Sequence, residues 1–210
     1  MAEYVSKNEV KPYRKIFDKM MADIRESIRK KGIIFTYQLV GSAKRNLVVR
    51  HHNKGFDCDY QIVIRKNKNN CSATEIKMLF GQLLNKVRPD GFSDVQDSTS
   101  AWTMKKTDSE NSRLIFSYDI VILKQDKNGV HIIRQDKENK KTGYFWNLLP
   151  DMNSADAGIS AIKGAQKWNE LRKVYLQKKT EKTEQGKYKG KASFQLLNEA
   201  INEVIKADRQ

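Results

Sequence analysis

Two short motifs in the first third of the chain most constrain its fold. An apolar run ends in Gly41-Ser42, and a second apolar run, residues 56–64, carries Asp57 and Asp59. Side chains in a β-strand alternate between faces, so aspartates at i and i+2 project from the same face. Because neighbouring carboxylates repel each other and burial adds to the cost, such a pair favours a bound divalent cation such as Mg²⁺. This predicts a metal site next to a phosphate-binding turn.

A third carboxylate interrupts a later strand-like segment. Residues 113–123, RLIFSYDIVIL, are rich in the aromatic and branched residues typical of strands, yet Asp119 stands in their middle. Buried without a partner it would be costly. On a strand beside that of Asp57 and Asp59 it completes a cluster able to hold two Mg²⁺ ions, which suits in-line displacement at phosphorus. The alternative is an edge-strand aspartate that faces water, since the imperfect alternation does not fix its face.

This combination of motifs resembles the polymerase-beta-like nucleotidyltransferase superfamily, and within it the branch of oligoadenylate synthetase, cyclic GMP-AMP synthase and their bacterial relatives. The resemblance covers roughly residues 10–135 and rests on few positions. It implies that the Gly-Ser turn holds the donor phosphates, that the paired aspartates bind metal and that Asp119 is the third ligand. Fourteen residues lie between Ser42 and Asp57, a few more than is usual in the family, so a longer loop is expected around residues 51–55.

The turn itself supplies candidate nucleotide-binding residues. Backbone N–H groups at a helix start, together with a hydroxyl, can bind triphosphate oxygens, which assigns Gly41 and Ser42 to this role. Lys44 and Arg45 follow closely, and Lys44 is included as a nucleotide-binding candidate. The competing interpretation is that both are ordinary surface residues, because exposed basic residues are abundant in this chain.

The charge of the chain restricts its partners. Forty lysines and arginines against twenty-five acidic residues give a net charge of +15 and a pI near 9.7. Such an excess favours a polyanionic acceptor such as RNA or a nucleotide, and argues against a cationic one. Cys58 and Cys71 show no zinc-binding spacing. Neither a signal peptide nor a membrane-spanning run is recognisable, so we expect a cytoplasmic protein without a membrane partner.

The periodicity of apolar residues predicts an α+β fold, with a nucleotidyltransferase-type mixed β-sheet flanked by helices and a C-terminal helical extension. Residues 93–112 have no clear pattern. Residues 1–150 are expected to form the catalytic core, and residues 151–210 a helical extension packed on it with a mobile Lys-rich segment at 177–192. The expected elements are a helix with Pro12 in its first turn, strands at 33–40 and 57–64, a helix at 73–87, a hairpin of 113–124 and 130–134, one helix at 154–175 and a last helix from Ser193.

Two function hypotheses follow from these patterns. The first is a Mg²⁺-dependent nucleotidyltransferase, using two ions for which Mn²⁺ is an alternative. It moves a nucleoside monophosphate from an NTP to a hydroxyl of RNA, tRNA or a nucleotide and releases pyrophosphate. Synthesis of a cyclic or linear oligonucleotide second messenger is a sub-hypothesis, although the chain is short for it. The second hypothesis is a non-catalytic, basic nucleic-acid-binding module on the same scaffold. The donor base, the acceptor, the linkage and the oligomeric state are left open.

The sequence also contains a nuclease-like pattern. Asp57 or Asp59 followed by Glu75-Ile76-Lys77 imitates the D…ExK signature of restriction-type nucleases. That chemistry needs the glutamate and lysine on a strand beside the aspartate. Ser72-x-x-Glu75 instead has the spacing of a capping box at the start of a helix, which explains the glutamate without catalysis.

Overall fold

The computed structural model forms two compact units. The larger unit is made of residues 5–48 and 53–149, and the smaller of residues 1–4, 49–52 and 150–210. The structure describes residues 2–51, 54–111, 113–136, 143–150, 154–181 and 191–207.

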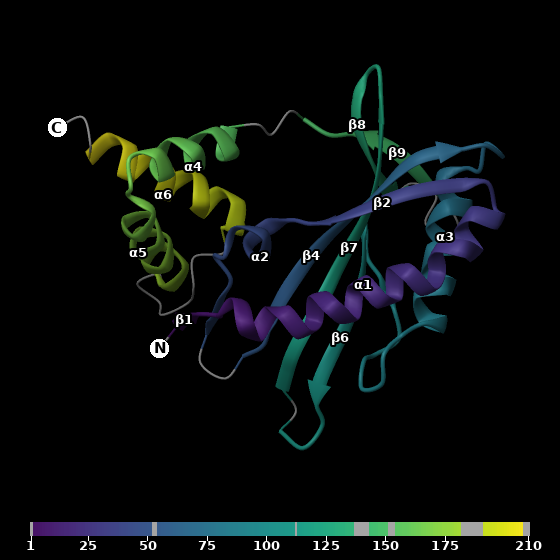
Figure 1. The fold of residues 1–210 in the computed structure, drawn as a ribbon, viewed down its shortest axis with the longest axis horizontal. Coiled ribbons are helices and arrows are strands. Elements are labelled where there is room, and N and C mark those ends of the chain that lie inside the picture. Colours follow the sequence, from purple (N-terminus) through teal and green to yellow (C-terminus); the bar gives the residue numbers. More distant parts are fainter. Residues whose placement is uncertain are drawn as a thin grey trace. The chain divides into compact units, whose positions relative to one another are not determined.

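A seven-stranded sheet forms the larger unit, with helices against one of its faces (Figure 1). Only β4 and β7, in the middle, run parallel among the described strand pairs, so the predicted α+β fold with a mixed sheet is confirmed. β8 pairs with β7 beyond the end of β6, and with β9. The strand order is β2 (Ile33–Leu39), β4 (Phe56–Asn67), β7 (Arg113–Asp126), β6 (Ala101–Asp108) and β5 (Gln96–Asp97), followed off this path by β8 (Gly129–Gln135) and β9 (Tyr144–Leu148).

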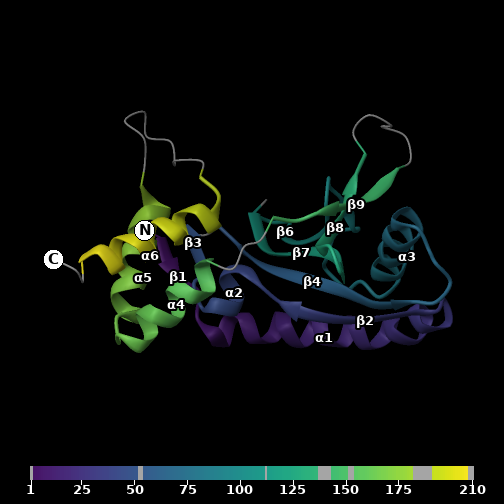
Figure 2. The same ribbon diagram turned by 90° about the horizontal axis from the view of Figure 1, so that it is seen from above.

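Helix α1 (Lys7–Lys30) runs along one face of the sheet (Figure 2). Its N-cap is Ser6, which forms a capping box with Glu9: each residue's side chain accepts a hydrogen bond from the other's backbone N–H. The expectation that Pro12 lies in the first turn was wrong, since Pro12 lies inside the helix. The capping box satisfies two N–H groups that would otherwise lack partners, so it sets the start of the helix.

Aromatic side chains fill the layer between α1 and the sheet. Phe17 stacks on Tyr60 of β4 with ring centroids 3.6 Å apart, and Tyr13 stacks on Phe116 of β7 at 3.8 Å. The Tyr118 hydroxyl donates to the backbone carbonyl of Tyr13 at 2.6 Å, which satisfies a buried phenol. Because alternate residues of β4 and β7 are buried in this layer, the residues between them face the opposite side of the sheet.

Helix α3 (Ala73–Lys86) covers the same face of the sheet, with Phe80 packed edge-on against Phe35 of β2. Gly81 of this helix lies against Trp102 of β6, and a Cβ at Gly81 would lie 2.6 Å from Cζ2 of the indole. Strands β5 and β6 lie within the segment 93–112 that had no clear pattern, and β9 was not expected. The predicted hairpin is present as β7 and β8.

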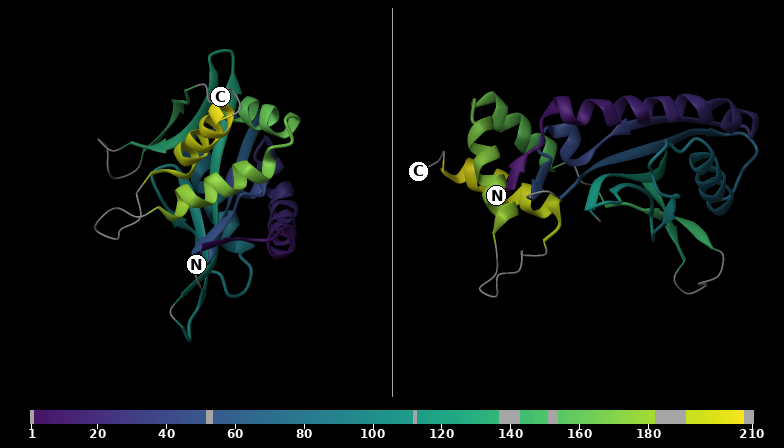
Figure 3. Two further views of the ribbon diagram at one scale, coloured as in Figure 1. Left: turned by 90° about the vertical axis from the view of Figure 1, so that its left-hand side faces the viewer. Right: turned by 90° about the horizontal axis from the view of Figure 1, so that it is seen from below.

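Three helices pack together in the smaller unit, where they are drawn in green and yellow in Figure 3. They are α4 (Ser154–Gly164), α5 (Trp168–Thr180) and α6 (Ser193–Ala207). The expectation of a single helix over 154–175 was wrong. The helix is interrupted between α4 and α5, where Gln166 adopts a left-handed φ of 58°. Part of the expected mobile segment 177–192 is helical, since α5 continues to Thr180, whereas residues 182–190 lie outside the described residues.

A two-stranded ribbon belongs to the same unit. Strand β1 (Ala2–Tyr4) pairs antiparallel with β3 (Val49–His51). The Tyr4 hydroxyl donates to the backbone carbonyl of Arg172 in α5 at 2.6 Å, and the Arg172 guanidinium lies 3.9 Å from the centroid of the Tyr4 ring. The extra residues between Ser42 and Asp57 therefore include a strand. The division at residue 150 into core and extension stays a prediction.

None of the helices in the described ranges combines the length and apolar composition needed to cross a membrane.

We expect Gly81→Ala to lower the free energy of unfolding by about 1–2 kcal/mol, although alanine is favoured over glycine within helices by about 1 kcal/mol. The added methyl would overlap the rigid Trp102 ring, which cannot turn aside as a flexible chain end could. Urea denaturation measures the change. Gly164→Ala is the control and should be neutral or stabilising, because the added methyl lies more than 4 Å from every described residue outside its own helix and chain neighbours. A Gly81→Ala variant as stable as the control would show that the indole shifts freely.

Candidate active site

Asp57, Asp59 and Asp119 come together on the face of the sheet opposite α1. The parallel register of β4 and β7 sets Asp59 directly beside Asp119. One carboxylate oxygen from each of the three residues lies within 4.8 Å of the other two, with Asp57 exposed and the other two half-buried. The structure thus assembles the predicted cluster, and Asp119 lies on the same face as the pair. The catalytic role of the three residues stays a prediction.

Cys58, between the paired aspartates, points to the opposite face and is fully buried. Burial, and then the negative charges of Asp57 and Asp59, raise the pKa of its thiol to about 12. The thiol is therefore neutral and packs as a small apolar side chain. Only the two carboxylates of this segment face the candidate site.

Gly41 lies directly against Asp59. At the end of β2, the backbone N–H of Val40 donates to the Asp59 carbonyl at 2.9 Å. Gly41 then turns the chain with a φ of +63°, and a Cβ at this position would overlap the Asp59 carboxylate. Glycine is therefore required here for two reasons: the left-handed backbone and the close approach of the Asp59 carboxylate. The expected proximity of the Gly-Ser turn to the paired aspartates is present.

The other residues of the turn belong to the short helix α2 (Gly41–Arg45). Ser42 is its second residue. Lys44 lines a surface pocket of about 500 Å³ formed with residues of α1, including Lys7, Lys11 and Arg14. Arg45 donates from Nη1 to the Gly41 carbonyl at 3.3 Å. Nucleotide binding by Gly41, Ser42 and Lys44 stays a prediction.

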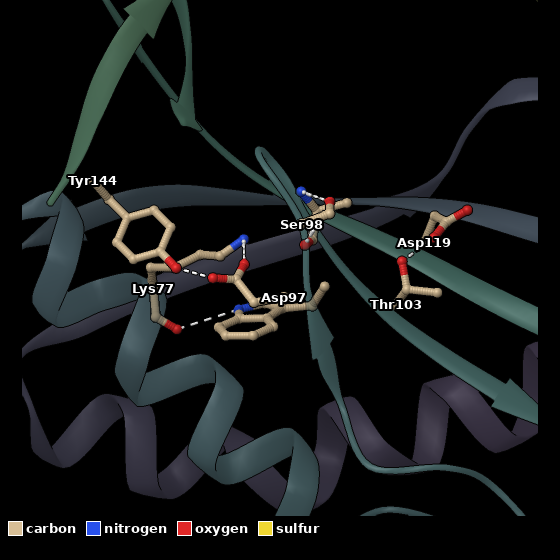
Figure 4. A network of polar contacts seen from close by, with 8 residues as sticks. Lys77, Asp97, Ser98, Thr103, Asp119 and Tyr144 are labelled. Carbon is tan, nitrogen blue, oxygen red and sulfur yellow. Dashed lines mark hydrogen bonds and ion pairs between the residues drawn. The ribbon is translucent and has the colours of Figure 1, made fainter. Parts of the chain in front are cut away.

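The nuclease pattern has no support in the geometry. The side chain of Glu75 accepts a hydrogen bond from the Ser72 backbone N–H at 2.7 Å, in the capping box at the start of α3, and this contact lowers the pKa of Glu75. Lys77 is buried against the Trp102 ring, on the helix-covered side of the sheet, and points away from Asp119 (Figure 4). Both residues of the ExK pattern are explained by the packing of α3.

Thr103 of β6 is a site residue that sequence analysis missed. Its hydroxyl donates to Oδ1 of Asp119 at 2.5 Å (Figure 4). Trp102 and Met104, on either side, are buried, so alternation along a strand places Thr103 on the opposite face, but the pairing of β6 with β7 is what brings it beside Asp119. The segment was not recognised as a strand because polar residues surround it.

The larger unit thus has a mixed sheet whose parallel central pair carries three aspartates beside a Gly-Ser turn. Among solved structures, the chain is similar to Vibrio cholerae DncV with GTP bound, at 14% identity and a TM-score of 0.64 over 93% of this chain and 65% of that chain. It is similar to Escherichia coli DncV with 3′-deoxy GTP bound, at 12% identity and a TM-score of 0.65 over 95% of this chain and 68% of that one.

A further similar structure is Vibrio cholerae DncV cyclic AMP-GMP synthase with the linear intermediate pppA(3′,5′)pG, at 13% identity and a TM-score of 0.57. The similarity covers 88% of this chain and 51% of that one, so this chain spans 51–68% of the length of the chains in these three structures. DncV is described as a prokaryotic cGAS homologue, which confirms the expected resemblance at the level of the fold. No protein-family model and no curated protein matches the sequence.

Proposed function

We propose that this chain is a metal-dependent nucleotidyltransferase, which transfers a nucleoside monophosphate from an NTP to a hydroxyl group and releases pyrophosphate. The observation that carries this proposal is the convergence of Asp57, Asp59 and Asp119 beside the Gly41 turn. Three carboxylates this close repel one another unless a cation compensates them. A set of hard oxygen donors within 4.8 Å of one another fits Mg²⁺ or Mn²⁺.

The roles of the residues follow from their placement. Asp57 and Asp59 would hold both ions, and Asp119 would hold the one nearer the acceptor. Bound there, the ions supply Lewis-acid activation and neutralise charge on the reacting phosphate. Gly41, lacking a side chain, leaves room for the Asp59 carboxylate, and the Ser42 hydroxyl donates to the phosphate oxygens of the NTP. Asp119 orients the acceptor hydroxyl and takes its proton as the new bond to the α-phosphorus forms and the bond to pyrophosphate breaks.

The excess positive charge supports a polyanionic acceptor such as RNA, tRNA or a nucleotide. Synthesis of an oligonucleotide second messenger is a second candidate, favoured by the similarity to DncV bound to a linear dinucleotide. A nucleic-acid-binding module without chemistry is the alternative. The carboxylate cluster opposes it, because three negative charges facing phosphates would weaken simple binding.

Stabilisation by NTP in the presence of Mg²⁺ tests the proposal. At a hundred times the dissociation constant, a bound NTP should stabilise the wild type by about 2.7 kcal/mol, or roughly 5–10 °C in melting temperature. The double variant Asp57→Ala/Asp59→Ala should gain little, because it lacks the carboxylates that would hold the ions. Thermal denaturation with each NTP, with Mg²⁺ or with EDTA, provides the measurement. If the wild type gains no more than the double variant, the binding-module hypothesis replaces this one.

A further inference from the structure

Thr103, Asp119 and Asp59 form a row across three adjacent strands. β6 and β7 pair Thr103 with Asp119, and β7 and β4 pair Asp119 with Asp59, so all three side chains lie on the same face. The distance from the Thr103 hydroxyl to Oδ1 of Asp119 is 2.5 Å. An ionised carboxylate can only accept, so the hydroxyl is the donor, and this short length is typical of charge-assisted hydrogen bonds.

We infer that Thr103 is a positioning residue, which holds one carboxylate oxygen of Asp119 so that the other is presented to the metal ion that Asp119 would bind. The inference rests on the proposed function. Without this contact, repulsion from Asp57 and Asp59 favours rotation of the Asp119 carboxylate away from the cluster. The hydrogen bond opposes that rotation before any ion binds, and removal of such an outer partner typically costs about ten- to a hundredfold in metal affinity.

The strand that carries Thr103 is anchored from the opposite face. Its neighbour Trp102 donates from Nε1 to the backbone carbonyl of Lys77 at 3.3 Å, and the Lys77 ammonium lies 4.4 Å from the centroid of the Trp102 ring. Lys77 is 1% exposed and pairs with Asp97 at 3.2 Å, and the Tyr144 hydroxyl donates to the same carboxylate (Figure 4). α3, β5 and β9 therefore fix β6, which in turn fixes Thr103 beside Asp119.

The branched side chain of Thr103 further restricts the direction of its hydroxyl. A β-branched side chain has few rotamers available, so its hydroxyl keeps its direction once the backbone is fixed. A serine at this position would keep the donor but lose the methyl group, whereas valine would keep the shape and lose the donor. These two substitutions separate the hydrogen bond from the packing.

The test is Mn²⁺ binding to the full chain, measured by isothermal titration calorimetry with the metal alone. We expect Thr103→Val to raise the dissociation constant about tenfold or more, and Thr103→Ser to stay within about twofold of the wild type. Thr103→Ala should behave as the valine variant, and replaces it if valine disturbs folding. In nucleotidyl transfer, the metal concentration for half-maximal rate should rise in parallel while the KM for NTP at saturating metal stays unchanged.

The outcomes separate this inference from the function on which it rests. If the valine and alanine variants bind Mn²⁺ as tightly as the wild type, while Asp119→Asn binds it weakly, Thr103 has no positioning role and the proposed function stands. If the wild type binds no Mn²⁺, or no more tightly than Asp119→Asn, both are overturned. A serine variant as impaired as valine would assign the effect to packing and overturn the inference.

Discussion

Asp59→Asn is expected to slow nucleotidyl transfer about a thousandfold, equivalent to about 4 kcal/mol of transition-state stabilisation. Asp59 is the centre of the site, since it lies beside Asp119 in the strand register and against Gly41. Asparagine keeps the shape and removes the charge, so the loss would report on electrostatics. The measurement is incubation with each α-labelled NTP and total cellular RNA, resolved on a gel. Label on RNA or in small soluble products identifies the acceptor.

The same substitution should affect stability in the opposite direction. Without metal, Asp59 is repelled by two neighbouring carboxylates, and removing its charge should stabilise the protein by about 1 kcal/mol. Urea denaturation in EDTA measures this. A variant that is more stable yet inactive indicates that the cluster is kept for chemistry at a cost to the fold.

Asp108→Asn is the matched control. Asp108, at the end of β6, accepts hydrogen bonds from Asn111, which lower its pKa, and from Nε of Arg113 at 3.0 Å. A lowered carboxylate pKa stabilises the fold above pH 4 and this contribution is lost as the pH falls through the folded-state value. The control should therefore lose stability and retain transfer. Full transfer by Asp59→Asn would overturn the proposed function.

Gly41→Ala is expected to reduce transfer about a hundredfold or more and to destabilise the protein by about 1–3 kcal/mol. Alanine is strained at a φ of +63°, and its methyl would displace the Asp59 carboxylate. Steady-state rates and urea denaturation measure the two effects.

Gly91→Ala separates the effect of backbone strain from the effect of displacing the Asp59 carboxylate. Gly91 has a similar φ of +80°, but only the flexible end of Lys106 lies near, at 3.8 Å. This control should lose stability through backbone strain alone and keep its transfer rate. If Gly41→Ala is as active as Gly91→Ala, the turn does not shape the site.

The sequence predicts those site residues whose placement depends on a pattern within a single segment. The alternation of side chains along one strand already places Asp57 and Asp59 on one face, and the Gly-Ser turn precedes them in the chain. Asp119 could be proposed but not oriented, because its segment is apolar on both sides and only the pairing with β4 fixes its face. Thr103 depends on the pairing of β6 with β7, a contact between segments that local periodicity does not reveal.

The errors in the predicted elements have local physical causes. The helix begins before Pro12 because the Ser6–Glu9 capping box satisfies backbone donors there, whereas a proline is merely compatible with a first turn. The break between α4 and α5 depends on a left-handed Gln166, a conformation that glutamine seldom adopts and that apolar spacing cannot indicate.

The parallel pairing of β4 with β7 has a consequence for the growing chain. Asp59 and Asp119, which lie side by side across this pair, are sixty residues apart in sequence. They become neighbours only when β4 and β7 pair. A chain that ends before residue 119 therefore carries only two of the three carboxylates. The cluster on which the proposed function depends forms only after both strands have been synthesised and have paired.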